Sequence, residues 1–131
     1  MRILLDTCAV LWLANGEPLE PAARKAIVEG ERHVLPITAW EITNLVRKNR
    51  ISLTMPVGAW IERAFRGIGA KELAINTRLL IESCTLPGAP PNDPADRIIV
   101  ASAREHDLII VTRDAAILDY AALGHAKAMR C

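Results

Sequence analysis

The sequence predicts an α/β fold built on a mainly parallel central sheet. Two observations support this: short aliphatic runs alternate with helical segments along the whole chain, and the runs at 2–5 and 108–111 end directly in polar residues. Strands that alternate with helices are typical of parallel sheets, whose strands are buried on both faces. In such sheets, ligands bind beyond the carboxyl ends of the strands.

Five segments are predicted to be strands because each is a short run rich in aliphatic residues. The fourth, Leu-Ile-Ile-Val, is the clearest, and the last is expected to be a weak edge strand. The predicted strands are residues 2–5, 33–37, 72–75, 108–111 and 126–129.

Seven segments are predicted to be helices. Pro21, Pro56 and Pro94 mark three helix starts, because proline is favoured at the first helical position. The pair Asn15-Gly16 marks a helix end, because glycine readily adopts the left-handed backbone found there. The predicted helices are residues 10–13, 22–29, 38–49, 56–66, 77–84, 94–103 and 115–122.

Three of these helices carry candidate N-terminal caps. Thr38 and Glu41 have the spacing of a capping box, in which each side chain bonds to the backbone N–H of the other residue. Thr77 is predicted to cap the helix that ends near Cys84, and Asp93 to cap the helix that opens at Pro94.

The composition indicates one globular domain, residues 1–131. The chain is 51% hydrophobic and 24% charged with a net charge of +1, which indicates neither disorder nor an extended basic surface. Cys8, Cys84 and Cys131 form an odd set without C-x-x-C spacing, which argues against disulfides and a structural zinc site. No apolar run is long enough for a membrane helix, so we expect a cytoplasmic protein without a membrane partner.

Acidic residues gather at one predicted edge of the sheet. Asp6 ends the first strand, Asp114 follows the fourth, and Glu41 begins the helix after the second. Asp93 and Asp96 open the helix before the fourth strand, three residues apart, so one helical face can present both. Because the carboxyl ends of parallel strands share an edge, we expect these acids to lie close together.

Most of these acids also have a purely structural explanation. Asp93 and Asp114 are placed to cap the helices that follow them, and Glu41 could be the far half of a capping box. Asp6 is harder to explain in this way, because a carboxylate directly after a buried strand is costly unless something pairs with it. No nearby Lys or Arg in the sequence is an obvious partner.

A cluster of carboxylates predicts a bound cation. Two carboxylates ~5 Å apart repel each other by about 3 kcal/mol at an effective dielectric near 20. Hard ions such as Mg²⁺ and Mn²⁺ prefer oxygen ligands, and such a site suits phosphodiester hydrolysis. Thr7 and Thr112 stand beside Asp6 and Asp114, either to orient a carboxylate or a metal-bound water or as ordinary strand and capping residues.

Four motifs, taken together, resemble the PIN domain and more narrowly the VapC-type toxins of bacterial toxin–antitoxin pairs. They cover nearly the whole chain in order: Leu4-Leu5-Asp6-Thr7, Thr38-Ala39-Trp40-Glu41-Ile42, Asp93-Pro94-Ala95-Asp96-Arg97 and Val111-Thr112-Arg113-Asp114. The resemblance implies a PIN-like three-layer sandwich in which helices flank both sides of a parallel sheet. It also implies a single nuclease domain over residues 1–131.

The resemblance further implies a divalent-metal-dependent endoribonuclease. Asp6, Asp96 and Asp114 are expected to hold Mg²⁺ or Mn²⁺ directly or through water, with Asp93 as an accessory acid. Glu41 would complete the site or position the attacking water. The expected partners are an RNA substrate, often structured RNA such as tRNA, a cognate antitoxin that inserts a basic side chain into the acidic pocket, and a second copy in a homodimer.

This chain departs from the pattern of such sequences at four positions. Cys8 and Leu45 stand where a histidine and a lysine are common, and Asn49 and Ala95 replace a common glycine and aromatic. Every acidic position is kept, so the departures bear on the substrate and the partner more than on the chemistry.

The remaining polar and aromatic residues give weaker signals. Arg97, a supporting residue, and Arg113 either contact phosphate or form ion pairs with neighbouring acids. The basic patch is interpreted as a solvated helix end that could touch an RNA backbone, the histidines as structural or surface residues, and the tryptophans as core. These sets are Arg47, Lys48 and Arg50; His33, His106 and His125; and Trp12, Trp40 and Trp60.

Two other classes of function stay open on the residues alone. A phosphoryl-transfer or phosphatase domain also places an Asp at a strand end, although Cys8 stands where such a phosphatase would have a second Asp. A non-catalytic module could instead receive a partner helix on the surface formed around residues 57–66.

Overall fold

The computed structural model describes all residues, 1–131, and contains one five-stranded sheet. All neighbouring strands are parallel, in the order β3-β2-β1-β4-β5. The strands are β1 (Arg2–Leu5), β2 (Glu31–Val34), β3 (Lys71–Glu72), β4 (Ile109–Thr112) and β5 (Lys127–Arg130). All five predicted strands therefore exist, including the edge strand at the end of the chain.

Seven helices connect and follow these strands, as predicted. They are α1 (Thr7–Ala14), α2 (Pro21–Glu29), α3 (Pro36–Arg47), α4 (Val57–Ile68), α5 (Thr77–Cys84), α6 (Pro94–His106) and α7 (Ala115–Ala122). None of the seven helices combines the length and the hydrophobicity that a membrane-spanning segment requires.

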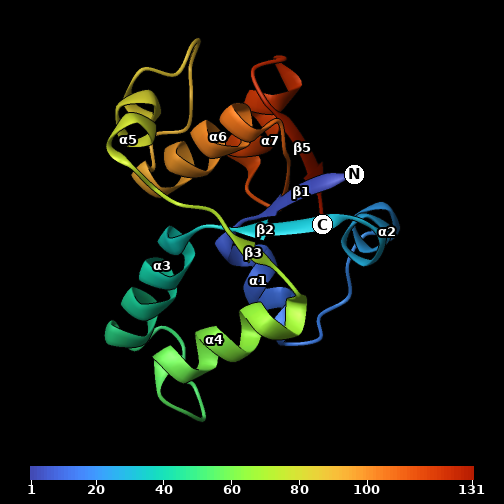
Figure 1. Ribbon diagram of the computed structural model, residues 1–131, viewed down its shortest axis with the longest axis vertical. Coiled ribbons are helices and arrows are strands. Elements are labelled where there is room, and N and C mark those ends of the chain that lie inside the picture. Colours follow the sequence, from blue (N-terminus) through green and yellow to red (C-terminus); the bar gives the residue numbers. More distant parts are fainter.

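The helices form a layer on each side of the sheet. Figure 1 shows α5, α6 and α7 on one side and α1, α3 and α4 on the other. Successive side chains of β1 alternate between two apolar cores: Ile3 and Leu5 pack with residues of α1, α2 and α3, whereas Leu4 packs with residues of α6 and α7. All three are at most 1% exposed, so helices cover both faces of the sheet at β1. The predicted three-layer α/β sandwich with a parallel sheet is therefore confirmed.

Pro36 decides where β2 ends and α3 begins. The strand predicted at 33–37 and the capping box predicted at Thr38 are wrong in their bounds, because β2 ends at Val34 and α3 begins at Pro36. Proline has a fixed φ and no N–H to leave unpaired, so it suits the first helical position. Thr38 is therefore inside the helix and fully buried.

Two other predictions from the sequence need correction. The third strand is limited to Lys71–Glu72 rather than 72–75, although Leu73 N–H still donates to Val34 O at 2.9 Å. Asn76, not Thr77, caps α5: its side-chain oxygen accepts a hydrogen bond from Leu79 N–H at 2.9 Å. The first difference shortens a strand, the second changes only the capping residue of a helix whose bounds are as predicted, and the topology is unchanged.

The strand order creates a switch point beside β1. The chain passes from β1 to β2 and β3 on one side, then returns to the other side of β1 for β4 and β5. The connections that leave β1 and β4 diverge there, and this is where open α/β sheets bind ligands. Asp6 and Asp114 follow these two strands.

The predicted structural roles of two histidines are confirmed. His33 is buried in β2 with Nδ1 3.0 Å from Ile3 O, and His125 stacks on Tyr120 with ring centroids 4.9 Å apart. The core interpretation of the tryptophans is wrong for Trp40, which is 61% exposed on α3. Trp60 packs against the core, and Trp12 lies beneath the Arg113 guanidinium.

Candidate active site

Asp6 is held at the carboxyl end of β1 by two hydrogen bonds. One carboxylate oxygen accepts from Ala9 N–H at 2.8 Å and so caps α1, and the other accepts from the Thr112 hydroxyl. Thr112 lies beside Asp6 because β1 and β4 pair with Leu5 opposite Val111. The 4% exposed carboxylate is therefore paired with a helix N-terminus and a hydroxyl rather than a cation.

Asp114 is joined to the same threonine. Its side chain accepts a hydrogen bond from Ile117 N–H at 2.9 Å and caps α7, while its backbone N–H donates to Thr112 Oγ1 at 2.9 Å. Thr112 thus connects the two acids that follow β1 and β4. Of the two interpretations left open for this threonine, the structure supports the orientation of a carboxylate.

Glu41 comes from the side of β2 and is fixed by Thr7. The Thr7 hydroxyl donates to Glu41 Oε1 at 2.5 Å and lies 3.2 Å from Thr38 Oγ1. These contacts join the first residue of α1 to the first turns of α3. Because α3 starts at Pro36, Glu41 has no capping role, and its other carboxylate oxygen makes no hydrogen bond within the protein.

Asp93 and Asp96 mark the start of α6. Asp93 caps the helix as predicted, with its carboxylate accepting from Asp96 N–H at 3.0 Å, and Pro94 stands at the first helical position. The Asp96 carboxylate makes no hydrogen bond or ion pair within the protein. Capping uses one oxygen of the Asp93 carboxylate and leaves the other free, so a capping role does not exclude a ligand role.

The site carries more negative charge than its surroundings neutralise. Burial raises the pKa of Asp6 and of Glu41 above their usual values, and nearby carboxylates add to both effects. Burial and then the charges of Asp114, Asp93, Glu41 and Asp6 raise the pKa of Asp96 to about 7. The structure therefore brings the five predicted acids into one electrostatic cluster.

No cation of the protein balances this cluster. Each ion pair in the molecule involves another acid, namely Glu31, Glu62, Glu82 or Asp107. The N-termini of α1, α6 and α7 each contribute a partial positive charge, worth about 0.3–1 kcal/mol apiece. That is less than the repulsion expected between neighbouring carboxylates at this depth.

The donor chemistry fits a hard divalent ion. The cluster offers only carboxylate and hydroxyl oxygens, which Mg²⁺ and Mn²⁺ prefer. No three of the acidic, histidine and cysteine side chains are close enough to surround one ion directly. Mg²⁺ keeps several of its water ligands and is commonly held by one or two carboxylates, so the observed spacing is compatible with it.

The two arginines beside the acids do not pair with them. Arg97 Nη1 lies 3.5 Å from Ser83 O, and Arg113 donates to Cys131 O at 2.5 Å and to Pro18 O at 2.9 Å. The Arg113 guanidinium also lies 3.0 Å from the centre of the Trp12 ring. The predicted ion pairs are therefore wrong, and Arg113 anchors the end of the chain and the loop before α2.

A cleft between α1 and α3 leads away from the acids. It has a volume of about 590 Å³ and is lined by Thr7, Cys8 and Leu11 of α1, by Trp40, Glu41, Asn44 and Leu45 of α3, and by Lys48, Arg50, Asp93, Pro94 and Ala95. Burial and the surrounding carboxylates raise the pKa of the Cys8 thiol to about 11. Trp40 lines this cleft, a position that the sequence analysis did not predict because it assigned the tryptophans to the core.

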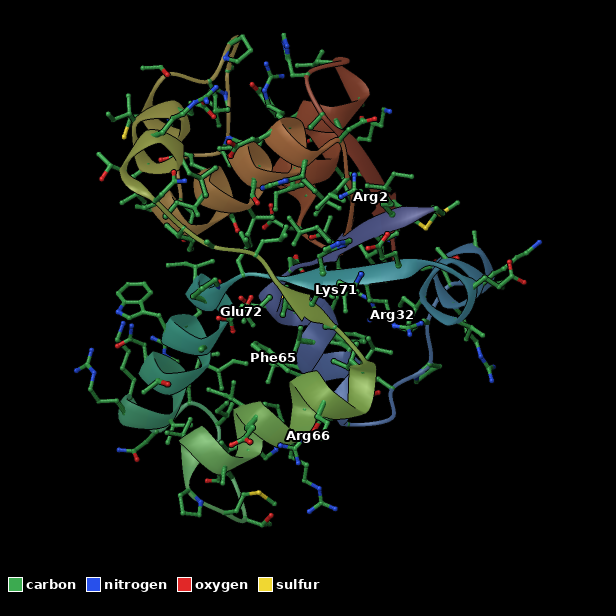
Figure 2. The ribbon with its side chains drawn as sticks, viewed as in Figure 1. Arg2, Arg32, Phe65, Arg66, Lys71 and Glu72 are labelled. Carbon is green, nitrogen blue, oxygen red and sulfur yellow. The ribbon has the colours of Figure 1, made fainter.

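A larger groove lies away from the acidic cluster. It has a volume of about 730 Å³ between α1, α2 and α4, and most of its lining residues are apolar. Arg32 and Arg63 are its charged residues, and the Nε of Arg32 is buried without a hydrogen-bond partner. Figure 2 shows Arg32 next to α2 with Phe65 and Arg66 on the neighbouring α4. We call this surface the helix groove.

The fold and the site define an α/β protein with a carboxylate cluster at the switch point of a parallel sheet. The family model of the PIN domain matches residues 3–123, and the chain belongs to the PIN domain family. It is 32% identical over 114 residues to Ribonuclease VapC22 of Mycobacterium tuberculosis, which covers 86% of each chain. The family predicted from the four motifs is therefore confirmed.

Solved structures share this fold at low sequence identity. The crystal structure of VapBC2 from Rickettsia felis, bound to a DNA fragment from its promoter, matches with a TM-score of 0.70 at 12% identity, covering 99% of this chain and 98% of that one. A toxin–antitoxin complex from Klebsiella pneumoniae matches with a TM-score of 0.65 at 20% identity, covering 97% and 95%. These likenesses extend over nearly the whole chain.

Proposed function

We propose that this protein is a divalent-metal-dependent endoribonuclease that acts as the toxin of a toxin–antitoxin pair. The observation that carries the proposal is the cluster of five acids at the carboxyl edge of the sheet. None of the five forms an ion pair within the protein, and three of them, Asp6, Glu41 and Asp96, have raised pKa values. The 32% identity to a protein named as a ribonuclease supports RNA as the substrate.

In this proposal, Asp6, Asp96 and Asp114 hold the metal ion either directly or through its water ligands. Mg²⁺ or Mn²⁺ bound there would activate water for attack on the phosphodiester and neutralise charge on the scissile phosphate. The Thr112 hydroxyl holds Asp6 and receives the Asp114 N–H, so it fixes the relative position of two ligands. Asp93 adds negative charge as an accessory acid. Arg97 is proposed as a supporting residue that contacts phosphate.

Glu41 is proposed to orient the attacking water. One of its oxygens is occupied by the Thr7 hydroxyl at 2.5 Å, which leaves the second oxygen to accept a hydrogen bond from water. The raised pKa of Glu41 makes it a better proton acceptor than an exposed glutamate. Thr7 is a positioning residue, because it acts through Glu41.

The partner protein is proposed to be a cognate antitoxin that docks in the helix groove. An apolar groove between helices suits an amphipathic segment of a partner, and the positive charges of Arg32 and Arg63 in its lining favour an acidic side chain on that segment. A solved structure with this fold, from Klebsiella pneumoniae, is described as a toxin–antitoxin complex. We also propose a cytoplasmic homodimer, to which the exposed Leu80 and Ile81 of α5 would contribute.

The activity is tested with purified protein and RNA, with Mg²⁺ or Mn²⁺ and with excess chelator. We expect cleavage that requires the metal and is abolished in Asp6→Asn, which keeps an oxygen to cap α1. Cleavage that persists in chelator, or at full rate in Asp6→Asn, would contradict the proposal. Trapping of an acyl-phosphate at Asp6 would instead favour a phosphoryl-transfer enzyme.

Metal binding is tested separately by thermal unfolding. An ion present at about 100 times its Kd stabilises the folded state by about 2.7 kcal/mol, so Mg²⁺ or Mn²⁺ should raise the Tm by several degrees. Asp96→Asn should reduce this shift, and NaCl at equal ionic strength should not reproduce it. If neither metal shifts the Tm while a partner still binds in the helix groove, the non-catalytic module is the better description.

A further inference from the structure

We propose that the cleft between α1 and α3 binds single-stranded RNA next to the scissile phosphate, with Trp40 stacking on an unpaired base and Lys48 and Arg50 binding phosphates. The inference rests on the proposed nuclease function and adds a base-binding and phosphate-binding site to it. The cleft contains Glu41 and Asp93 at one end and Lys48 and Arg50 among its other lining residues.

The side chains that line the α3 wall share one face of the helix. Trp40, Asn44 and Lys48 are spaced four residues apart, so they follow one another along a single stripe. Glu41 and Leu45 form the adjacent stripe with the same spacing. From Glu41 to Lys48 is about two helical turns, or about 10 Å of rise at ~1.5 Å per residue. The wall therefore runs from the acidic cluster to a positive charge.

Trp40 differs from the other two tryptophans of the chain. It is 61% exposed, whereas Trp12 and Trp60 are partly buried against Arg113 and the apolar core. A large aromatic surface exposed in a cleft beside a candidate nuclease site suits a base, because proteins recognise unpaired RNA bases by stacking them on aromatic rings. A base inside a duplex cannot be stacked in this way, which is why the proposed ligand is single-stranded.

Lys48 and Arg50 are free to meet phosphates. Neither forms an ion pair or a side-chain hydrogen bond within the protein, whereas the neighbouring Arg47 bonds to Asn44 Oδ1 at 3.2 Å and does not line the cleft. The basic patch of the sequence is thus divided: two of its members face the cleft and one is engaged on α3. A polyanion in the cleft would meet positive charge where it leaves the acidic cluster.

The apolar part of the lining suits the flanking base and sugar. Leu11 of α1 and Leu45 of α3 face the cleft from opposite walls, and Ala95 closes its acidic end. A leucine at position 45 keeps this part of the wall uncharged, so the positive charges of the cleft lie farther from the acids. An apolar surface with phosphate contacts beyond it is the arrangement found where single strands bind without base pairing.

The test measures binding and cleavage separately. Binding of fluorescein-labelled oligouridylate and oligoadenylate is measured by anisotropy in an Asp96→Asn background, which removes cleavage. Trp40→Ala should weaken binding about tenfold or more, while Trp40→Phe should largely restore it, because base stacking on one aromatic is worth about this factor. A duplex of the same length should be insensitive to Trp40→Ala.

The phosphate contacts are tested by salt dependence. The double variant Lys48→Gln/Arg50→Gln should reduce the slope of log Kd against log salt concentration by about 1.4, because each phosphate contact to a single strand contributes about 0.7. Lys25→Gln is the matched control, since Lys25 is an exposed lysine of α2 without an ion pair and away from the cleft. It should leave the slope unchanged.

Different failures point to different conclusions. If metal-dependent cleavage is observed but Trp40→Ala binds and cleaves single strands like the unaltered protein, the cleft proposal is wrong and the nuclease proposal stands. If single strands bind through Trp40 but no RNA is cleaved with either metal, the nuclease proposal is wrong and the cleft is a binding site for single-stranded RNA. If Trp40→Ala changes only the oligomeric state or partner binding, measured by light scattering, Trp40 is a protein contact and the inference is overturned.

Discussion

The two edges of the sheet carry the same kind of side chain in opposite electrostatic settings. At the amino edge, the carboxylate of Glu31 has two basic partners: Oε1 lies 2.9 Å from Lys71 Nζ and Oε2 lies 3.7 Å from Arg2 Nε. Asp107 Oδ1 lies 2.9 Å from Lys127 Nζ at the same edge. Figure 2 shows Arg2 on β1 and Lys71 on β3, the two strands that flank β2. At the carboxyl edge, the five acids of the cluster have no such partner.

The pKa directions follow this difference. The hydrogen bond and charge of Lys71 lower the pKa of Glu31, and those of Lys127 lower the pKa of Asp107. Burial and mutual repulsion raise the pKa values of Asp6, Glu41 and Asp96 instead. The acids at the amino edge are therefore neutralised by basic side chains of neighbouring strands. The acids at the switch point, where a ligand would bind, are not neutralised.

The largest expected effect is on RNA cleavage, which should depend on the acids of the carboxyl edge and not on those of the amino edge. Asp114→Asn should reduce metal-dependent RNA cleavage by about 100-fold or more, equivalent to about 2.7 kcal/mol of transition-state stabilisation. Asparagine keeps an oxygen for Ile117 N–H, so the cap of α7 and the fold should survive. Cleavage rates at saturating Mg²⁺, with circular dichroism to confirm folding, measure the effect.

Asp107→Asn is the matched control for that variant. Asp107 lies just before β4, as Asp114 lies just after it, and its left-handed backbone, φ 53°, is one that asparagine tolerates. Its cleavage rate should match that of the unaltered protein. Equal losses in both variants would mean that charge anywhere on the sheet matters, and the contrast between the edges would lose its functional meaning.

The next effect concerns stability and pH in the absence of metal. Because the pKa of Asp96 is raised to about 7, the folded protein holds this proton at pH values where the unfolded chain, with a pKa of 3.8, has released it. Stability should therefore fall as pH rises between these two values. The expected loss from Asp96 is about 1 kcal/mol after allowance for solvent screening.

Denaturant unfolding at about pH 5 and about pH 8, compared between the unaltered protein and Asp96→Asn, measures this loss. Histidines titrate in the same range, so the difference between the two proteins carries the information. Asp96→Asn should be the more stable of the two at the higher pH and show the flatter dependence. A steeper fall in the variant would contradict the repulsion inferred at the carboxyl edge.

The sequence was sufficient for features that depend on neighbouring residues. Asp6 and Asp114 each follow a short aliphatic run, and this local pattern alone placed them at the strand ends. The parallel topology then implied that they meet. The start of α3 was misplaced because two local signals competed there, and Pro36 prevailed over the capping-box spacing of Thr38 and Glu41.

Features that depend on the register of distant strands were not accessible from the sequence. The hydrogen bond from Thr112 to Asp6 joins residues 106 positions apart and exists because Leu5 lies opposite Val111. The pairing of Glu31 with Lys71 likewise requires β3 to lie beside β2. The exposure of Trp40 could not be foreseen either, because a helix shows its free face only when its packing partners are known.

The smallest expected effect lies at the amino edge. Lys71→Gln removes the strongest partner of Glu31, so the pKa of Glu31 should rise toward its ordinary value. A carboxyl whose pKa is lowered stabilises the fold above its unfolded pKa, and this stabilisation is lost as pH falls through the folded pKa. The variant should therefore be slightly less stable at neutral pH and show less dependence on acid, since exposed ion pairs contribute little.

Carboxyl-carbon NMR titration of Glu31 in both proteins measures the pKa change, and cleavage assays measure its relevance. RNA cleavage and the Mg²⁺-induced Tm shift should be unchanged in Lys71→Gln, because Glu31 keeps Arg2 as a partner at 3.7 Å and a single exposed carboxylate is a weak magnesium site. A new metal-dependent Tm shift in this variant would show that uncompensated charge alone recruits metal. In that case, the arrangement of Asp6, Asp96 and Asp114 at the switch point would no longer explain the proposed selectivity of the carboxyl edge.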